Sequence, residues 1–153
     1  MIPKVLEDYL QSENADYEVI AHENLPEMPQ EIAKAVVLSE GEDRVMVVLP
    51  QSAKFDLETL RFLLDRETLS FDSPEDLMEV FPDCKPEALP ALGIPYNVPC
   101  YLDETLLDGP DIFIESGNLK DVIKLSSDEY LRVSHAEVGD FYQHKAIENP
   151  FID

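Results

Sequence analysis

One lysine stands in an unusual place for a charged side chain. Lys34 lies within residues 32–38 (IAKAVVL), which are otherwise apolar. Such a run is typical of a strand inside a sheet, where a lysine must either extend its ammonium to solvent or serve a polar pocket. Periodicity alone favours extension to solvent. The lysine is still a candidate partner for a phosphate or a carboxylate, because its ammonium carries a full charge and three hydrogen-bond donors.

The familiar catalytic motifs are absent from the sequence. There is no Gly-x-Ser-x-Gly turn, no phosphate-binding loop and no Gly-x-Gly-x-x-Gly motif. The two cysteines, Cys84 and Cys100, are not spaced as zinc ligands, and no histidine cluster accompanies them. A disulfide is not expected in a reducing compartment, so both are interpreted as ordinary thiols. A Cys–His nucleophile pair stays open, because the neighbours of a cysteine in the fold are not visible in sequence.

The charge balance limits the classes of partner. The 153 residues include 33 acidic and 11 basic side chains, giving a net charge of −22. Phosphate backbones are bound mainly through Lys and Arg, so this surface should repel nucleic acid on average, and DNA binding is not expected. Repulsion is screened beyond roughly 10 Å at moderate salt, so a few local cations could still bind an RNA end. No apolar run is long enough to span a membrane and no signal peptide is recognisable, so we expect a cytoplasmic protein.

The apolar pattern predicts the elements that would position Lys34. Two apolar runs, residues 33–38 and 44–49, flank turn residues and predict a β-hairpin inside a sheet. Further strands are expected at 17–21, 100–102, 111–115 and 122–125. Helices are expected over 3–13, after an Asp56 cap, after a Ser73 cap to about Val80, and from Ser127. The proline-rich residues 82–99 are predicted to be a loop.

This mixture of elements predicts one α+β domain. Helices and strands do not alternate regularly, which disfavours a doubly wound parallel sheet. We expect a single domain over residues 1–153, built around a mixed, curved β-sheet flanked by helices. Its core is expected over about 5–133, followed by a C-terminal tail over 134–153.

Seven short motifs follow one another in an informative order. They are 17–22 (YEVIAH), 33–38 (AKAVVL), 47–50 (VVLP), 55–57 (FDL), 81–84 (FPDC) with Pro90 and Gly93, 98–104 (VPCYLDE) and 114–118 (IESGN). Their order and spacing resemble the YbaK/prolyl-tRNA-synthetase editing-domain family, whose Ala-Lys-x-Val-Val lysine corresponds to Lys34. Glu87 replaces the first glycine of the family's Gly-x-x-Pro-x-x-Gly loop, and the chain between His22 and Lys34 is shorter than usual.

The resemblance implies hydrolysis of the ester of a mischarged aminoacyl-tRNA. In the family, water attacks the ester that joins the amino acid to the terminal adenosine, without a protein nucleophile, metal or organic cofactor. Positioning and preorganised donors supply the catalysis. By resemblance, Lys34 would be the catalytic residue and would hold the terminal phosphate or the reacting ester. The expected substrate-binding residues are His22, Glu87, Pro90, Gly93, Gly117 and Asn118.

The resemblance also implies the partners. They are the aminoacyl-tRNA 3′ end, carrying a small uncharged amino acid such as alanine, and an aminoacyl-tRNA synthetase that delivers it. One alternative is a catalytically degenerate YbaK-fold binding module, because Glu87 adds bulk and charge where a glycine would let backbone approach a substrate. A hydrolase of another small ester or amide is a third possibility. A structural, hydrogen-bonded role for His22 is as consistent with the sequence as a site role.

Overall fold

The computed structural model of the protein describes residues 2–25 and 31–142. Within these ranges the α-helices are α1 (Lys4–Ser12), α2 (Leu57–Leu64), α3 (Pro74–Val80) and α4 (Ser127–Ser134). The strands are β1 (Glu18–Ala21), β2 (Ile32–Glu40), β3 (Asp43–Pro50), β4 (Ser70–Phe71), β5 (Cys100–Asp103), β6 (Asp111–Glu115), β7 (Asp121–Ser126) and β8 (Glu137–Gly139). Short 3-10 turns are η1 (His22–Asn24), η2 (Pro86–Ala88), η3 (Ile94–Tyr96) and η4 (Glu104–Leu107).

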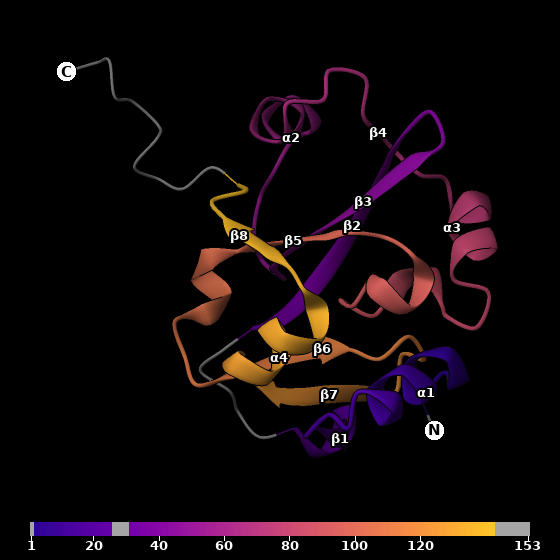
Figure 1. Ribbon diagram of the computed structural model, residues 1–153, viewed down its shortest axis with the longest axis vertical. Coiled ribbons are helices and arrows are strands. Elements are labelled where there is room, and N and C mark those ends of the chain that lie inside the picture. The colour runs from indigo at the N-terminus through magenta and orange to yellow at the C-terminus, as the bar shows by residue number, and fades with distance from the viewer. Residues whose placement is uncertain (1, 26–30, 143–153) are drawn as a thin grey trace.

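One mixed sheet organises the domain (Figure 1). Its strand order is β1-β7-β6-β2-β3-β5-β8, and β4 pairs with β2 off this path. Pairing is parallel between β2 and β6, between β3 and β5, and between β5 and β8, and antiparallel elsewhere. The predicted α+β fold with a mixed sheet is confirmed. No described helix is both long enough and apolar enough to cross a membrane.

The predicted hairpin forms the centre of the sheet. Strands β2 and β3 pair antiparallel from Ala33↔Pro50 to Glu40↔Asp43, and β6 and β5 flank the pair on either side. Five consecutive β3 residues, 45–49, are buried, because both faces of the central sheet are covered. Their continuous apolar sequence, without strict alternation, follows from this double burial.

The two faces of the sheet carry separate cores. Ala33 and Val37 of β2 belong to a first core that includes residues of α1 and α4, such as Leu6 and Tyr130. Leu38 belongs to a second core on the opposite face, whose other buried members are Val45, Val47, Leu49, Ala53, Leu60, Leu69 and Phe141. Successive strand side chains point to opposite faces, so the position of a residue in β2 decides which core it meets.

The predicted helix starts are confirmed by their caps. Asp56 accepts a hydrogen bond from the Thr59 amide at 2.7 Å at the start of α2. Ser73 accepts from the Asp76 amide at 3.1 Å before α3, where Pro74 takes the first helical position. These contacts satisfy backbone donors that a helix start otherwise leaves unpaired.

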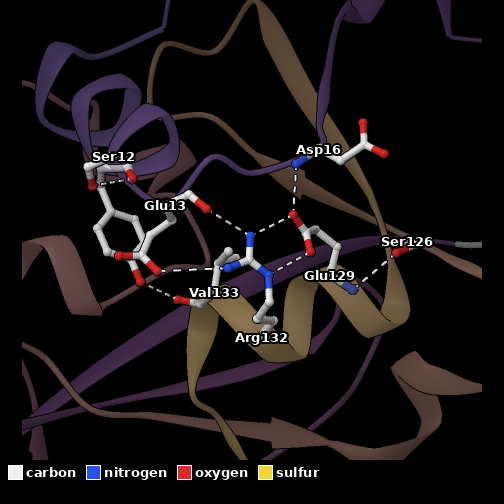
Figure 2. Close-up of polar contacts among 8 residues, drawn as sticks. Ser12, Glu13, Asp16, Ser126, Glu129, Arg132 and Val133 are labelled. Carbon is white, nitrogen blue, oxygen red and sulfur yellow. Dashed lines mark hydrogen bonds and ion pairs between the residues drawn. The ribbon is translucent and has the colours of Figure 1, made fainter.

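A charged cluster fastens α4 to the chain that leaves α1 (Figure 2). Arg132 of α4 donates to the Glu129 carboxylate at 2.8 Å and to the Glu13 carbonyl at 3.0 Å. Glu129 in turn accepts from the Asp16 amide at 2.7 Å. The hydrogen bonds from Arg132 and Asp16 lower the pKa of Glu129 to about 2. The cluster thereby fixes where β1 begins, two residues after Asp16.

Two strands were not predicted from sequence. Strand β4 has only two residues, and β8 lies in the expected tail, where it pairs parallel with β5. Phe141 is buried and donates its amide to the fully buried carboxylate of Asp103 at 2.8 Å. The packed domain therefore continues past residue 133, through residues 134–142. Residues 143–153 of the expected tail lie outside the described residues, and the predicted 82–99 loop contains η2 and η3.

Candidate functional site

Lys34 faces the second core, near the end of β3. In the parallel pair of β2 and β6, Ala33 lies opposite Ile114, and both belong to the first core. The next residue, Lys34, therefore points to the other face. Its Nζ donates to the carbonyl oxygens of Gln51 at 3.1 Å and Ala53 at 3.3 Å.

These contacts hold the Lys34 ammonium in place but occupy only two of its three N–H donors. The Nζ atom also lies 5.1 Å from the centre of the Phe55 ring, within the range of a cation–π interaction. An ammonium has three N–H donors, and the two carbonyls accept two of them. Counting the described residues alone, one donor of this fixed cation remains, and it can bind an anionic or carbonyl oxygen with little reorganisation.

A histidine–glutamate pair lies on the same face as Lys34. Glu115 follows Ile114 in β6, so its side chain points away from the first core, as that of Lys34 does. His22 Nε2 lies 3.2 Å from Glu115 Oε1, and the His22 amide donates to the Lys120 carbonyl at 2.8 Å. The His22 side chain is 35% exposed and the Glu115 side chain is 16% exposed. The pair is thus reachable from solvent while its carboxylate is largely withdrawn from water.

Asn118 shapes the turn between β6 and β7. Its Oδ1 accepts from the amides of Lys120 and Asp121, both at 2.8 Å, and its Nδ2 donates to the Asp121 carboxylate at 2.8 Å. The hydrogen bond from Asn118 lowers the pKa of Asp121, and the charge of His22 contributes in the same direction. Asn118 therefore holds the turn that carries the backbone acceptor for His22.

The two glycines of the expected site are required by close packing. A Cβ on Gly93 would lie 2.1 Å from the Val98 carbonyl oxygen. Gly117 has φ +110°, a region that L side chains rarely adopt, and its Cβ would lie 2.9 Å from Cys84 Sγ. The Gly93 amide donates to Cys100 Sγ at 3.2 Å, and the Gly117 carbonyl accepts from the Lys85 amide at 2.7 Å. Both glycines thus have a structural reason to be present.

The remaining expected residues lie in the long loop before β5. Pro90 is buried between Leu89 and Ala91, which belong to the first core. Glu87 is exposed in η2, so its bulk fills no buried space. Of the expected set, the structure brings His22 to the face of Lys34, whereas Pro90 and Gly93 lie with the first core. Gly117 and Asn118 form the turn that follows Glu115.

Sequence reasoning did not single out Glu115. Its partner His22 is 93 residues away in the chain, so no local motif connects them. The only signal was its place in the 114–118 segment, directly before the Ser116–Gly117 turn. Parallel pairing of β2 with β6 brings it beside Lys34, and that pairing is not readable from one sequence.

The two cysteines and the metal-binding residue types form no further site within residues 2–25 and 31–142. Both thiols are free and buried, and burial raises the pKa of Cys84 to about 12 and of Cys100 to about 11. Almost none of either thiol is therefore the nucleophilic thiolate at neutral pH, which argues against the Cys–His alternative. Among the described residues, no three His, Cys, Asp or Glu side chains come together as a metal site.

Solved structures with the same fold were found at low sequence identity. One, described as a "putative trans-editing enzyme for prolyl tRNA synthetase", is 20% identical with a TM-score of 0.77, and the match covers 92% of this chain and 96% of that one. A scaffold used for grafting linear epitopes is 17% identical with a TM-score of 0.77, over 92% and 96% of the two chains. A "putative signal transduction protein" from Marinobacter aquaeolei VT8 is 19% identical with a TM-score of 0.76, and the match covers all of this chain but 33% of that one.

The family comparison is more direct than these structural matches. A search of curated proteins found no relative. The model of the aminoacyl-tRNA editing domain, however, matches residues 14–133, a span that holds β1 to β7 and includes His22, Lys34 and Glu115. The match and the shared fold agree with the order of motifs found in the sequence. The chain therefore belongs to the aminoacyl-tRNA editing domain family.

Proposed function

We propose that this protein is a deacylase, which hydrolyses the ester between a small, wrongly attached amino acid and the 3′ end of a tRNA. The observation that carries the proposal is the Lys34 ammonium in an editing-domain fold. The ammonium is held by the carbonyls of Gln51 and Ala53, on the sheet face that also carries the Glu115–His22 pair. A positive charge fixed before the substrate arrives stabilises developing negative charge without reorganisation.

In the proposed reaction, water attacks the ester carbonyl carbon. Negative charge develops on the carbonyl oxygen, and the products are the free amino acid and the tRNA with a free ribose hydroxyl. Lys34 would hold either that oxygen or the terminal phosphate with its third N–H donor. The two roles differ kinetically, because a contact made only in the transition state affects kcat, whereas a uniform phosphate contact affects KM. His22, Asn118 and the Gly117 turn are proposed to shape the surroundings of Lys34. Glu87, Pro90 and Gly93 belong to the loop that packs with the first core, so any part they play at the substrate is proposed to be indirect.

The test is deacylation of a panel of mischarged tRNAs by the wild type and by Lys34→Met. Methionine keeps an unbranched side chain and removes the charge. We expect kcat/KM to fall about 10²- to 10³-fold, as on losing one oxyanion donor, with the fold retained. The loss should lie in kcat if Lys34 holds the ester oxygen and in KM if it holds the phosphate. Lys54→Met is the matched control, because Lys54 is exposed and lies in the same segment after β3. If the folded wild type hydrolyses no member of the panel, the proposal is refuted.

A binding module that has lost the reaction is the second candidate. The net charge of −22 favours it, because the charge opposes the approach of tRNA. Glu87→Gly separates the two candidates: a gain of hydrolysis indicates a weakened enzyme, whereas no change together with a tight protein partner indicates a module. Because Glu87 is exposed, the substitution should leave the fold intact.

A further inference from the structure

Lys34 and Glu115 carry opposite charges on neighbouring strands, yet the structure does not pair them. Ala33 and Ile114 are register partners, and the two charged residues follow them directly on the same face. Adjacent strands lie about 5 Å apart, so an ion pair would be within reach of both side chains. Lys34 instead directs its Nζ to the carbonyls of Gln51 and Ala53. The negative charge of Glu115 is therefore not neutralised by Lys34 and can attract a positively charged group of a ligand.

The Glu115 carboxylate is only partly satisfied. Its side chain is 16% exposed, and among the described residues its one partner is the His22 ring, at Oε1. Withdrawing a carboxylate from water is costly unless hydrogen bonds or a cation compensate, and an ionised carboxylate can accept several donors. A ligand that brings an ammonium group would therefore gain a charge-assisted hydrogen bond here.

Among the described residues, a groove of about 480 Å³ lies on the face next to Glu115. Its lining includes Glu18, Ile20, Phe113 and Lys124. Phe113 and Glu115 are two residues apart on β6, so their side chains share a face. Phe113 thus connects the groove to the face that carries the Glu115 carboxylate.

An aminoacyl ester has the matching distribution of charge. It carries an α-ammonium one carbon away from the carbonyl that becomes negative during hydrolysis. We propose that Glu115 binds the α-ammonium of the substrate and so makes the site specific for esters of free amino acids. The inference rests on the proposed deacylase function. His22 holds the other side of the carboxylate and acts as a positioning residue.

The test compares two substrates that differ at one group. Alanyl-tRNA and lactyl-tRNA, made on the same tRNA, share the ester, but lactate has a hydroxyl in place of the ammonium. Because the α-ammonium also activates the ester by induction, each kcat/KM is divided by the spontaneous hydrolysis rate constant of the same substrate. For the wild type, we expect this corrected value to be about 10- to 100-fold higher with alanyl-tRNA, the range of one charge-assisted hydrogen bond. In Glu115→Gln the ratio should fall towards 1, whereas Glu115→Asp, which keeps the charge, should retain a preference. The preference is a ratio measured on one protein sample, so partial unfolding affects both substrates equally.

Glu42→Gln is the matched control. Glu42 is exposed in the turn between β2 and β3 and does not line the groove, so the substitution removes the same charge away from the proposed ligand. It should keep the wild-type ratio. A corrected ratio near 1 in the wild type, or an unchanged ratio in Glu115→Gln, would overturn the inference while leaving the deacylase proposal intact. A folded Glu115→Gln protein inactive on both substrates would also overturn it. A wild type inactive on both would instead refute the proposed function.

Discussion

Gly93→Ala tests whether the glycine of the loop before β5 serves packing or substrate. Gly93 has φ −88° and ψ −23°, which alanine adopts without penalty, so the cost is steric alone. The new Cβ would lie 2.1 Å from the Val98 carbonyl oxygen and 3.0 Å from the Val98 carbonyl carbon. Both are backbone atoms, so no side-chain rotation relieves the overlap, and the segment must move by roughly 1 Å.

The displaced segment carries several hydrogen bonds. The Gly93 carbonyl accepts from the amides of Tyr96 at 2.8 Å and Val98 at 3.0 Å, and the Gly93 amide donates to Cys100. Weakening two of these bonds costs about 1 kcal/mol each, and overpacking adds about 1 kcal/mol or more. We therefore expect a loss of about 3 kcal/mol in the free energy of unfolding, which lowers Tm by about 6–12 °C in a domain of this size.

Thermal and urea unfolding measure this loss. Gly41→Ala is the control, because Gly41 has φ +64° and no atom within 4 Å of its Cβ position. That substitution should cost only the backbone penalty of about 1 kcal/mol. A Gly93→Ala protein as stable as Gly41→Ala would refute the packing argument. If such a stable protein also lost deacylation, Gly93 would be needed at the substrate.

Two further predictions concern charge. First, the pKa of Glu129 is lowered to about 2 in the folded protein, below its unfolded value of about 4.3. The ionised carboxylate therefore contributes its full share of the free energy of unfolding above the unfolded pKa, and this share is lost as the pH falls towards 2. Glu129→Gln should lower the free energy of unfolding by about 1 kcal/mol at pH 7, and urea titrations should show this difference vanishing near pH 2. Second, kcat/KM on tRNA should rise as salt increases from about 10 to 100 mM, because the chain carries a charge of −22 and the screening length shortens from about 30 to 10 Å. A steep fall instead would indicate that contacts between Lys or Arg and phosphates dominate.

The sequence by itself determined the local elements. Apolar runs on either side of Gly41 specified the hairpin, because β-branched and apolar side chains fit a strand buried on both faces. Asp56, Ser73 and Pro74 specified two helix starts, because capping satisfies donors within three residues of the cap. The order of the short motifs also identified the family, which the match over residues 14–133 confirms.

Only the tertiary structure decided what surrounds Lys34. Parallel pairing of β2 with β6 joins segments about 80 residues apart, and it brings Glu115 and His22 to the face of the lysine. Strands β4 and β8 are two and three residues long, too short for a periodic pattern, and exist because a neighbouring strand accepts them. The sequence of a strand determines which of its side chains point to the same face as one another. The partner strand then decides which residues share a face, since hydrogen bonds between backbones carry no information about side chains.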